Sequence, residues 1–291
     1  MPHCRYTLRH ALTGLGVLSL LVVAGCDGGA TETPDPNPVA EKPAEAEAPP
    51  RAELDKSQLA AEAENRALVP SPAEMQKALL QAGITANLAE MVPERDLKMD
   101  VPNTDQVAVR TGVVIADLLL TVKDAKKPKM LTDLGKIKAG MTQLGAGKDI
   151  GVVIDDLKDR IQNDAVSRDD LVKELDELSG AIIPEIEYEA GDRAVPLIQA
   201  GSWLEGANLV ARAIVESGKI EEGSGLLKQP AVVSYFQKYV ATEGQDKAPS
   251  EVIGQLERTL ETLQTIAQKP KLTEEDVKTI QEATTSVLDL L

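Results

Sequence analysis

The sequence predicts an all-α fold, a multi-helix bundle that follows a disordered tether. Three observations predict it. Apolar residues recur at helical spacing from residue 68 to residue 291, capping motifs and prolines mark helix starts along the same stretch, and the residues before it have almost nothing to bury. No segment alternates between apolar and polar residues over a length that would make a sheet. We therefore expect one helical domain at 68–291.

The first 25 residues have the features of a bacterial export signal. Residues 1–10 carry two arginines, and the apolar run that follows at 11–23 is shorter than the roughly 20 residues of a membrane span. Residues 23–25 (Val-Ala-Gly) then precede Cys26 as in a lipobox, where small residues admit the peptidase and the thiol accepts a diacylglycerol. We expect cleavage between Gly25 and Cys26 and a lipid anchor on Cys26. The alternative is an ordinary secretory signal that contains a cysteine.

The anchor predicts a location at a cell membrane, on its periplasmic or extracytoplasmic face. Asp27 resembles the inner-membrane retention signal of enteric bacteria. That sorting rule does not hold across bacteria, so the inner and the outer membrane both stay open. Residues 26–67 are the expected lipidated tether. Within them, 27–50 are rich in Pro, Ala and Glu, which predicts a disordered and fairly stiff chain, and 51–67 are expected to form a frayed helix.

Local chemistry marks several helix starts within the domain. Ser71 and Glu74 have the spacing of a capping box, with proline at the first helical position, and Gly83 ends that helix. Pro230 and Pro249 indicate two further helix starts. Apolar periodicity predicts other helices at residues 104–123, 130–144, 149–163, 194–217 and 250–268.

Two more helix starts carry acidic residues at capping positions. In residues 167–170 (Ser-Arg-Asp-Asp) an acid is placed where it can cap a helix that runs to Ser179. Residues 273–276 (Thr-Glu-Glu-Asp) open the last helix in the same way, and that helix is expected to run to Leu291. Residues 185–189 (Glu-Ile-Glu-Tyr-Glu) alternate as a strand does, but this segment is too short and isolated to form a sheet.

Two of the predicted helices, at residues 107–122 and 194–215, are apolar nearly all round. Helices of this kind belong at the centre of a bundle. The first contains Gly112, and the second contains Gly201 and Gly206. Each glycine costs about 1 kcal/mol in a helix interior, and close helix–helix approach would offset that cost. We therefore expect these two helices to cross near their glycines.

Charge and aromatic content exclude several functions. The net charge of −16, from 31 basic and 47 acidic side chains, repels phosphate backbones, so nucleic acid is not an expected partner. A basic partner stays open, although acidity for solubility is the favoured interpretation. Aromatic residues make up 2% of the chain, which leaves few rings to stack on sugars or bases.

Cysteine and histidine are almost absent from the expected mature protein. His3, Cys4 and His10 leave with the signal, so no histidine remains and the remaining cysteine is the expected lipid site, Cys26. This composition excludes Ser-His-Asp and Cys-His catalysis, disulfides, and zinc, haem or iron–sulfur sites held by these residues. We expect no cofactor and no metal.

Four polar residues on the two apolar helices form a candidate site. Arg110 and Asp117 lie seven residues apart on the first helix, and Trp203 and Glu205 lie between the glycines of the second, which Arg193 precedes. Where the helices cross, these groups would meet in a semi-buried polar cluster whose charges must be paired. One hypothesis is a binding or acid–base site. The favoured hypothesis is an ion pair that fixes helix register, and no catalytic residue is assigned.

Other polar and aromatic patterns have ordinary structural explanations. Acidic residues gather at 155–159, 174–177 and 185–189, where they would suit a glycosidase or calcium, but no EF-hand loop is present and a solvated surface is favoured. Walker, G-x-G-x-x-G, G-x-S-x-G and S-x-x-K motifs are absent. Tyr235 and Tyr239 share one helix face, which predicts either a recognition patch or, preferably, packing against the second apolar helix.

Several spaced motifs carry a family resemblance. They are residues 70–72 (Pro-Ser-Pro), Gly112 with 116–118 (Ala-Asp-Leu), Asn163 with 168–171 (Arg-Asp-Asp-Leu), and 200–206 (Ala-Gly-Ser-Trp-Leu-Glu-Gly). With them, residues 68–215 resemble a family of uncharacterised all-helical bacterial proteins, many of which are lipoproteins. The resemblance implies an all-helical fold and no particular activity, and it implies that Asp117, Trp203 and Glu205 matter together. Members of the family carry an aromatic residue soon after the Ala-Asp pair, where this chain has Leu119 and Leu120, so no ring-based role carries over.

Three hypotheses about function follow. The first is a membrane-anchored, non-catalytic helical binding or scaffold module of the cell envelope with a protein or peptide partner. The second is a carboxylate-based envelope hydrolase that uses Asp117 and Glu205, which requires a cleft between two carboxyl groups about 5–10 Å apart. The third is a small-ligand carrier, which requires an apolar cavity between the helices.

Overall fold

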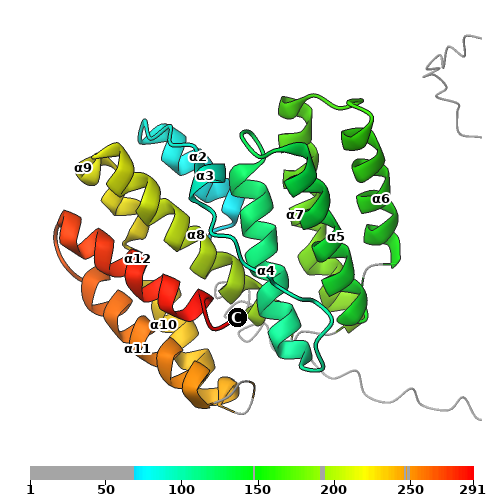
Figure 1. Cartoon of the computed structure of the whole chain (residues 1–291). Coiled ribbons are helices and arrows are strands. Elements are labelled where there is room, and N and C mark those ends of the chain that lie inside the picture. The colour runs from blue at the N-terminus through cyan, green and yellow to red at the C-terminus, as the bar shows by residue number, and fades with distance from the viewer. Residues whose placement is uncertain (1–68, 147, 191–193, 246, 248–249) are drawn as a thin grey trace, which may run out of the picture. The chain divides into compact units, whose positions relative to one another are not determined.

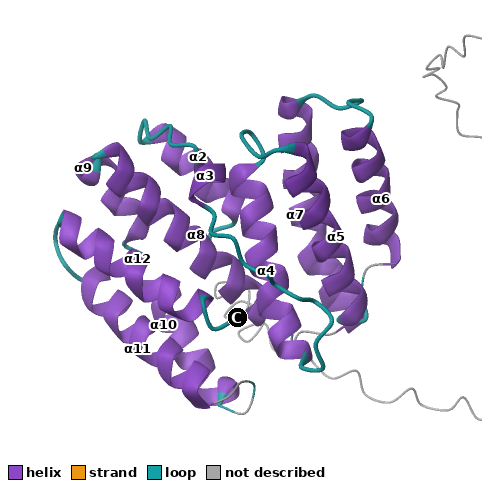
Figure 2. Cartoon of the chain, in the orientation of Figure 1, coloured by secondary structure: helices purple, strands orange, loops and turns teal. Residues whose placement is uncertain are grey.

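The computed structural model describes residues 69–146, 148–190, 194–245, 247 and 250–291, all of which fall in one compact unit. Every regular element among these residues is helical, so the all-α prediction is confirmed (Figure 2). None of the described helices has the length and apolar character needed to cross a membrane. The predicted signal peptide, the cleavage site at Gly25 and Cys26, and the tether lie outside the described residues.

The helices follow one another along the chain with short connections. Their bounds are α2 (Pro72–Gln81), α3 (Leu88–Met91), α4 (Thr104–Thr121), α5 (Lys127–Gln143), α6 (Lys148–Gln162), α7 (Arg168–Ala190), α8 (Val195–Ser217), α9 (Ile220–Gly223), α10 (Pro230–Tyr239), α11 (Ser250–Ala267) and α12 (Glu274–Leu288). A 3-10 turn, η1 (Ser224–Leu227), precedes α10, and a π-helical turn, η2 (Val240–Gly244), extends it. The periodicity located the long helices other than α7 to within a few residues, whereas the short elements α3, α9, η1 and η2 were not predicted.

Helices α4 and α8 form the centre of the bundle, and the other helices pack on them in two groups (Figure 1). α5, α6 and α7 continue the bundle on the α4 side, whereas α10, α11 and α12 lie on the α8 side. α2 and α3 contact both central helices. Most residues of α4 and of α8 are buried, which is what their nearly continuous apolar sequence predicts.

The two central helices cross where glycine lets their backbones touch. A Cβ added to Gly112 would lie 2.9 Å from the backbone nitrogen of Ser202, and one added to Gly201 would lie 2.9 Å from a backbone carbonyl carbon of α4. Real Cβ atoms do not approach so closely, so only glycine fits at either position. Gly206 instead faces the sulfur of Met75 on α2. The predicted crossing is confirmed at Gly112 and Gly201, and it is wrong for Gly206.

Side-chain caps fix the helix starts. Ser71 Oγ accepts the N–H of Glu74 at 3.2 Å, and the Glu74 carboxylate accepts the N–H of Ser71 at 2.7 Å. Thr273 opens α12 with the same reciprocal arrangement. At α7 the capping group is Ser167, whose hydroxyl oxygen accepts the N–H of Asp170 at 3.2 Å, so the serine rather than the acid caps this helix.

Helix α7 corrects one prediction and explains the alternating segment. It does not end at Ser179 but continues to Ala190, and the alternating segment at 185–189 is helical. Buried side chains recur at helical spacing along it, at Leu171, Leu175, Leu178, Ile182 and Ile186. The alternation arises because Ile186, which is buried at helical spacing, lies between two glutamates that are only half-buried. Packing against the rest of the bundle outweighs a proline within the helix, at residue 184.

Candidate functional site

Asp117 of α4 and Glu205 of α8 are brought together by the crossing of their helices, as predicted, and both are buried. A third residue joins them from the loop between α3 and α4. The guanidinium of Arg95 places Nη2 2.5 Å from Glu205 Oε1 and 3.9 Å from Asp117 Oδ1. The loop side chain therefore bridges the two carboxylates of the central helices. Nothing in the periodicity of the sequence pointed to Arg95.

A second ion pair extends this group toward α5. Lys129 Nζ lies 2.6 Å from Asp133 Oδ2, one helical turn away, and 3.8 Å from Asp117 Oδ2. Asp133 is also buried. We name the five residues Arg95, Asp117, Lys129, Asp133 and Glu205 the buried charge cluster. It ties α4, α5, α8 and the α3–α4 loop to one another.

The charges in the buried charge cluster are nearly balanced. Two cations face three carboxylates, so the cluster is neutral when one carboxyl is protonated. Burial, and secondarily the charge of Glu205, raise the pKa of Asp117 well above its usual value, although Lys129 and Arg95 act in the opposite direction. Burial lowers the pKa of Arg95, but the nearby carboxylates, Glu205 above all, together outweigh it and the net pKa is raised. The surroundings of Asp117 thus favour its protonated form.

Hydrogen bonding within the cluster is incomplete. Although Arg95 Nη2 and Glu205 Oε1 are within hydrogen-bonding distance, their geometry does not make a hydrogen bond. Among the described residues, the guanidinium nitrogens of Arg95 and the carboxylate oxygens of Glu205 have no other hydrogen-bond partner. Asp117 Oδ1 likewise has no hydrogen-bond partner among the described residues. The contacts are therefore held by charge, and loss of Arg95 would leave two buried carboxylates without their shared cation.

Two residues expected in the cluster lie elsewhere. Arg110 donates from Nε to the carbonyl oxygen of Leu291 at 2.6 Å and from Nη1 to that of Lys98 at 2.6 Å, so it anchors two chain segments and not Asp117. The Trp203 indole N–H donates to Gln229 Oε1 at 2.7 Å. Arg193 lies outside the described residues. The structure therefore brings together Asp117 and Glu205, but not Arg110 or Trp203.

The aromatic segment of α10 packs on α8, as the favoured interpretation predicted. The Phe236 ring lies 5.3 Å from the Trp203 ring, centroid to centroid, and Tyr235 lies 5.1 Å from Phe236. Tyr239 is buried as well. These rings join α10 to the central helix rather than form an exposed patch.

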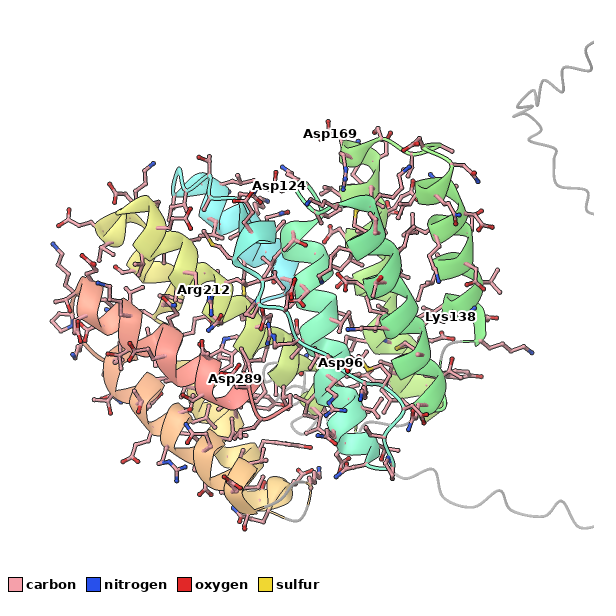
Figure 3. All side chains as sticks on the ribbon, in the orientation of Figure 1. Asp96, Asp124, Lys138, Asp169, Arg212 and Asp289 are labelled. Atoms are coloured by element: carbon pink, nitrogen blue, oxygen red, sulfur yellow. The ribbon has the colours of Figure 1, made fainter. Side chains whose placement is uncertain are left out.

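Most acidic side chains outside the cluster lie at the surface, although Asp105 and Asp276 are buried. Exposed side chains, among them Asp124 and Asp169, project outward from the bundle (Figure 3). Asp155, Asp156 and Asp159 of α6 are exposed, as the solvated-surface interpretation predicted. Within the part of the chain that the structure describes, no group of three or more His, Cys, Asp or Glu side chains has the arrangement of a metal site.

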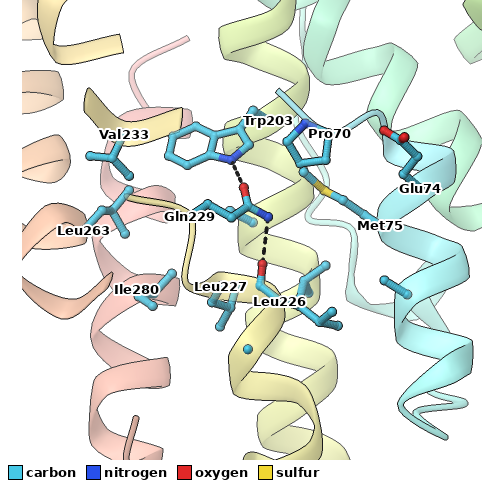
Figure 4. Close-up of a pocket in the computed structure, with 14 residues that line it drawn as sticks. Pro70, Glu74, Met75, Trp203, Leu226, Leu227, Gln229, Val233, Leu263 and Ile280 are labelled. Carbon is cyan, nitrogen blue, oxygen red and sulfur yellow. Dashed lines mark hydrogen bonds between the residues drawn. The ribbon is translucent and has the colours of Figure 1, made fainter. Parts of the chain in front are cut away.

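Two cavities flank Trp203. The first, of about 420 Å³, lies between α2, α8, η1 and α10, and we name it the α2 cavity (Figure 4). The amide of Gln229 crosses it, accepting from Trp203 Nε1 and donating to the carbonyl oxygen of Leu226 at 2.7 Å. The residues that line it include Met75, Ala78, Trp203, Leu226 and Gln229.

The second cavity, of about 250 Å³, lies on the other side of Trp203, and we name it the α11 cavity. Residues of α4, α8, α10, α11 and α12 line it, together with residues of η2 and of adjoining loops, and it is partly open to solvent. Its lining is more apolar than that of the α2 cavity. The residues that line it include Ala200, Trp203, Tyr239, Lys247, Val252 and Leu256.

The carboxyl groups of Asp117 and Glu205 line neither cavity. The two features of the bundle are therefore separate: a buried charge cluster on one side of α8 and cavities around Trp203. No known protein-family model, curated protein or solved structure matches the chain. The function is therefore inferred from the geometry of the buried charge cluster and of the two cavities.

Proposed function

We propose that the protein is a lipid-anchored, non-catalytic binding module of the cell envelope, and that it binds the apolar part of a small ligand in the α11 cavity. The observation that carries this proposal is the cavity itself. It lies within a helical bundle, is lined mainly by apolar side chains, and has about 250 Å³ of free volume.

An empty cavity of this size is energetically unfavourable. Protein interiors are packed as densely as organic crystals. The α11 cavity is partly open to solvent, so without a ligand its mainly apolar lining is exposed to water. An apolar occupant would restore the missing contacts, and this supports the small-ligand hypothesis over a scaffold without a ligand.

The placement of the carboxylates argues against the hydrolase hypothesis. A glycosidase needs both carboxyl groups at the substrate. Here Asp117 and Glu205 are buried beside Arg95 and line neither cavity. Their arrangement suits a structural role that joins helices, and it offers no surface on which a substrate would be cut.

The anchor of this module is the proposed lipid on Cys26. The lipobox at residues 23–26 and the polar, proline-rich sequence that follows it support this proposal. Replacing Cys26 with alanine should abolish the incorporation of radioactive fatty acid. Labelling that persists in the Cys26→Ala protein would show that the anchor is not attached there.

Ligand binding can be measured through Trp203, the one tryptophan of the chain, because it lines the α11 cavity. The full chain carrying Cys26→Ala avoids detergent, which would compete for an apolar site. We expect a brominated decanol, in which bromine quenches indole fluorescence, to quench Trp203 in a saturable way. Ala200→Leu and Val252→Phe, which fill the α11 cavity from α8 and from α11, should abolish quenching.

The matched control is Ala78→Leu, which fills the α2 cavity on the other side of the same indole. It should leave quenching unchanged. Quenching that survives in folded Ala200→Leu and Val252→Phe but is lost in Ala78→Leu would place the ligand in the α2 cavity and contradict the proposal. Absence of saturable quenching in the parent protein would contradict it as well.

A further inference from the structure

We propose that the ligand of the α11 cavity is a medium-chain amphiphile, with an apolar body of about ten carbons and an anionic head group bound by Lys247. This inference rests on the proposed function and adds to it the chemical class of the ligand. Two observations carry it: the volume of the cavity and the charge at its edge.

The volume sets the length of the apolar body. An engineered cavity of about 150 Å³ holds one benzene molecule, which corresponds to about 25 Å³ for each carbon atom. On that scale the α11 cavity, at about 250 Å³, holds about ten carbons. A palmitoyl chain exceeds this volume. The acyl chains of a lipid anchor are therefore too long to be accommodated whole, and a shorter chain fits.

Lys247 determines the expected head group. Among the described residues that line the cavity it is the one cation, in a chain whose net charge is −16. Its side chain is largely buried, with 13% exposed, and Nζ lies 4.6 Å from the centroid of the Tyr239 ring. An ammonium held in this way against an aromatic face and an apolar cavity is placed to meet an anion at the end of an apolar chain.

The neighbours of Lys247 leave it able to bind such an anion. Nζ lies 2.5 Å from the Tyr239 hydroxyl, and the carboxylate of Glu243, which is exposed, lies 3.8 Å away. An ammonium has three N–H donors, so these contacts do not exhaust it. Asp105, the acidic residue of the lining, lies in the first turn of α4, where the helix dipole favours its charge.

The test compares ligands of equal length and different charge in the Cys26→Ala protein. Decanoate, decanol and decylammonium would each be used to displace the brominated decanol from Trp203. We expect decanoate to bind about tenfold more tightly than decanol, and decylammonium to bind more weakly than either. Along the fatty acid series, affinity should rise from hexanoate to decanoate and should not rise further at palmitate.

Variants of the lysine decide whether the head group is recognised there. Lys247→Met keeps the length of the side chain and removes its charge, so the preference for decanoate over decanol should disappear. Lys247→Arg should retain the preference, and Lys271→Met, at an exposed lysine far from the cavity lining, should not change it. Decanol binding as tightly as decanoate, or a preference that survives in Lys247→Met, would overturn the inference while leaving the apolar site in place. If the protein binds the brominated decanol but none of these ligands displaces it, the probe lies outside the α11 cavity and both proposals are overturned.

Discussion

Arg95 Nη2 lies 2.5 Å from Glu205 Oε1, so a loop residue supplies the cation for a carboxylate buried in the central helix α8. Glu205 has no exposed side-chain surface, and Arg95 has 10%. Removing one partner of a buried pair leaves the other charge uncompensated, whereas an exposed pair contributes little. Arg95 therefore fixes the α3–α4 loop, much of which is exposed, to the core.

Arg95→Met should lower the free energy of unfolding by about 3–5 kcal/mol, because it leaves Glu205 and Asp117 without their shared cation. Denaturant unfolding followed by circular dichroism measures this change. The matched control is Lys278→Met, which breaks the exposed pair with Glu274 and should change stability by less than about 1 kcal/mol. Equal effects of the two substitutions would show that the buried pair contributes no more to stability than the exposed pair.

Asp117→Asn should make stability less dependent on pH. Burial and the charge of Glu205 raise the pKa of Asp117 in the folded protein above its unfolded value of about 3.9. Between these two pKa values the folded state binds more protons than the unfolded state, so stability falls as the pH rises through the folded-state pKa. Asp133, whose pKa burial also raises, contributes in the same direction.

The asparagine variant lacks the ionisation at Asp117, so it should gain stability relative to the parent protein as the pH rises. Unfolding curves recorded from about pH 4 to about pH 8 measure the difference. Asp276 has the opposite dependence, because a hydrogen bond from Lys269 lowers its pKa and its contribution is lost as the pH falls. It is unchanged in both proteins and cancels in the comparison. A variant that loses stability relative to the parent with rising pH would contradict the assigned pKa direction.

Gly112→Ala and Gly201→Ala should each destabilise the protein by about 1–3 kcal/mol, because the new methyl group would collide with the backbone of the opposite helix. Gly180→Ala in α7 is the control, since a Cβ there meets nothing within 4 Å. It should stabilise the protein by about 0.5–1 kcal/mol through helix propensity. Thermal unfolding of the three variants distinguishes a true close approach from a general effect of replacing glycine.

Gln229→Leu should cost about 1–3 kcal/mol, because it leaves the buried indole N–H of Trp203 without its acceptor. In a double-mutant cycle with Trp203→Phe, which has no N–H, the two losses should be less than additive. Denaturant unfolding of the parent, the two single variants and the double variant gives the coupling energy. Strict additivity would mean that the hydrogen bond contributes nothing measurable to stability.

The central helices and their crossing could be predicted because the signals for them are local and strong. Long apolar sequences with interior glycines indicate buried, closely approaching helices, and the crossing of α4 and α8 places Asp117 near Glu205. Arg110 was assigned to the same cluster because it shares a helix face with Asp117. Seven residues span about 10.5 Å of helix, however, so sharing a face does not bring the two side chains into contact.

The other residues of the buried charge cluster, and the α11 cavity, could not be predicted because they depend on contacts that leave no local pattern in the sequence. Arg95 lies in an irregular loop, where periodicity gives no information about burial. Lys129 and Asp133 have the i,i+4 spacing of an ordinary surface pair, and only the packing of α5 on α4 buries the aspartate. The α11 cavity arises from the combined fit of side chains from five helices, so it has no signature in any one segment.

The central claim is that the α11 cavity binds the apolar part of a ligand, and the position of a bound ligand tests it most directly. A crystal structure of the protein with the brominated decanol, with bromine located by anomalous scattering, gives that position. The account predicts bromine in the cavity between Ala200 of α8 and Val252 of α11, beside the Trp203 ring. Bromine elsewhere, or a cavity closed by repacked side chains, would contradict it.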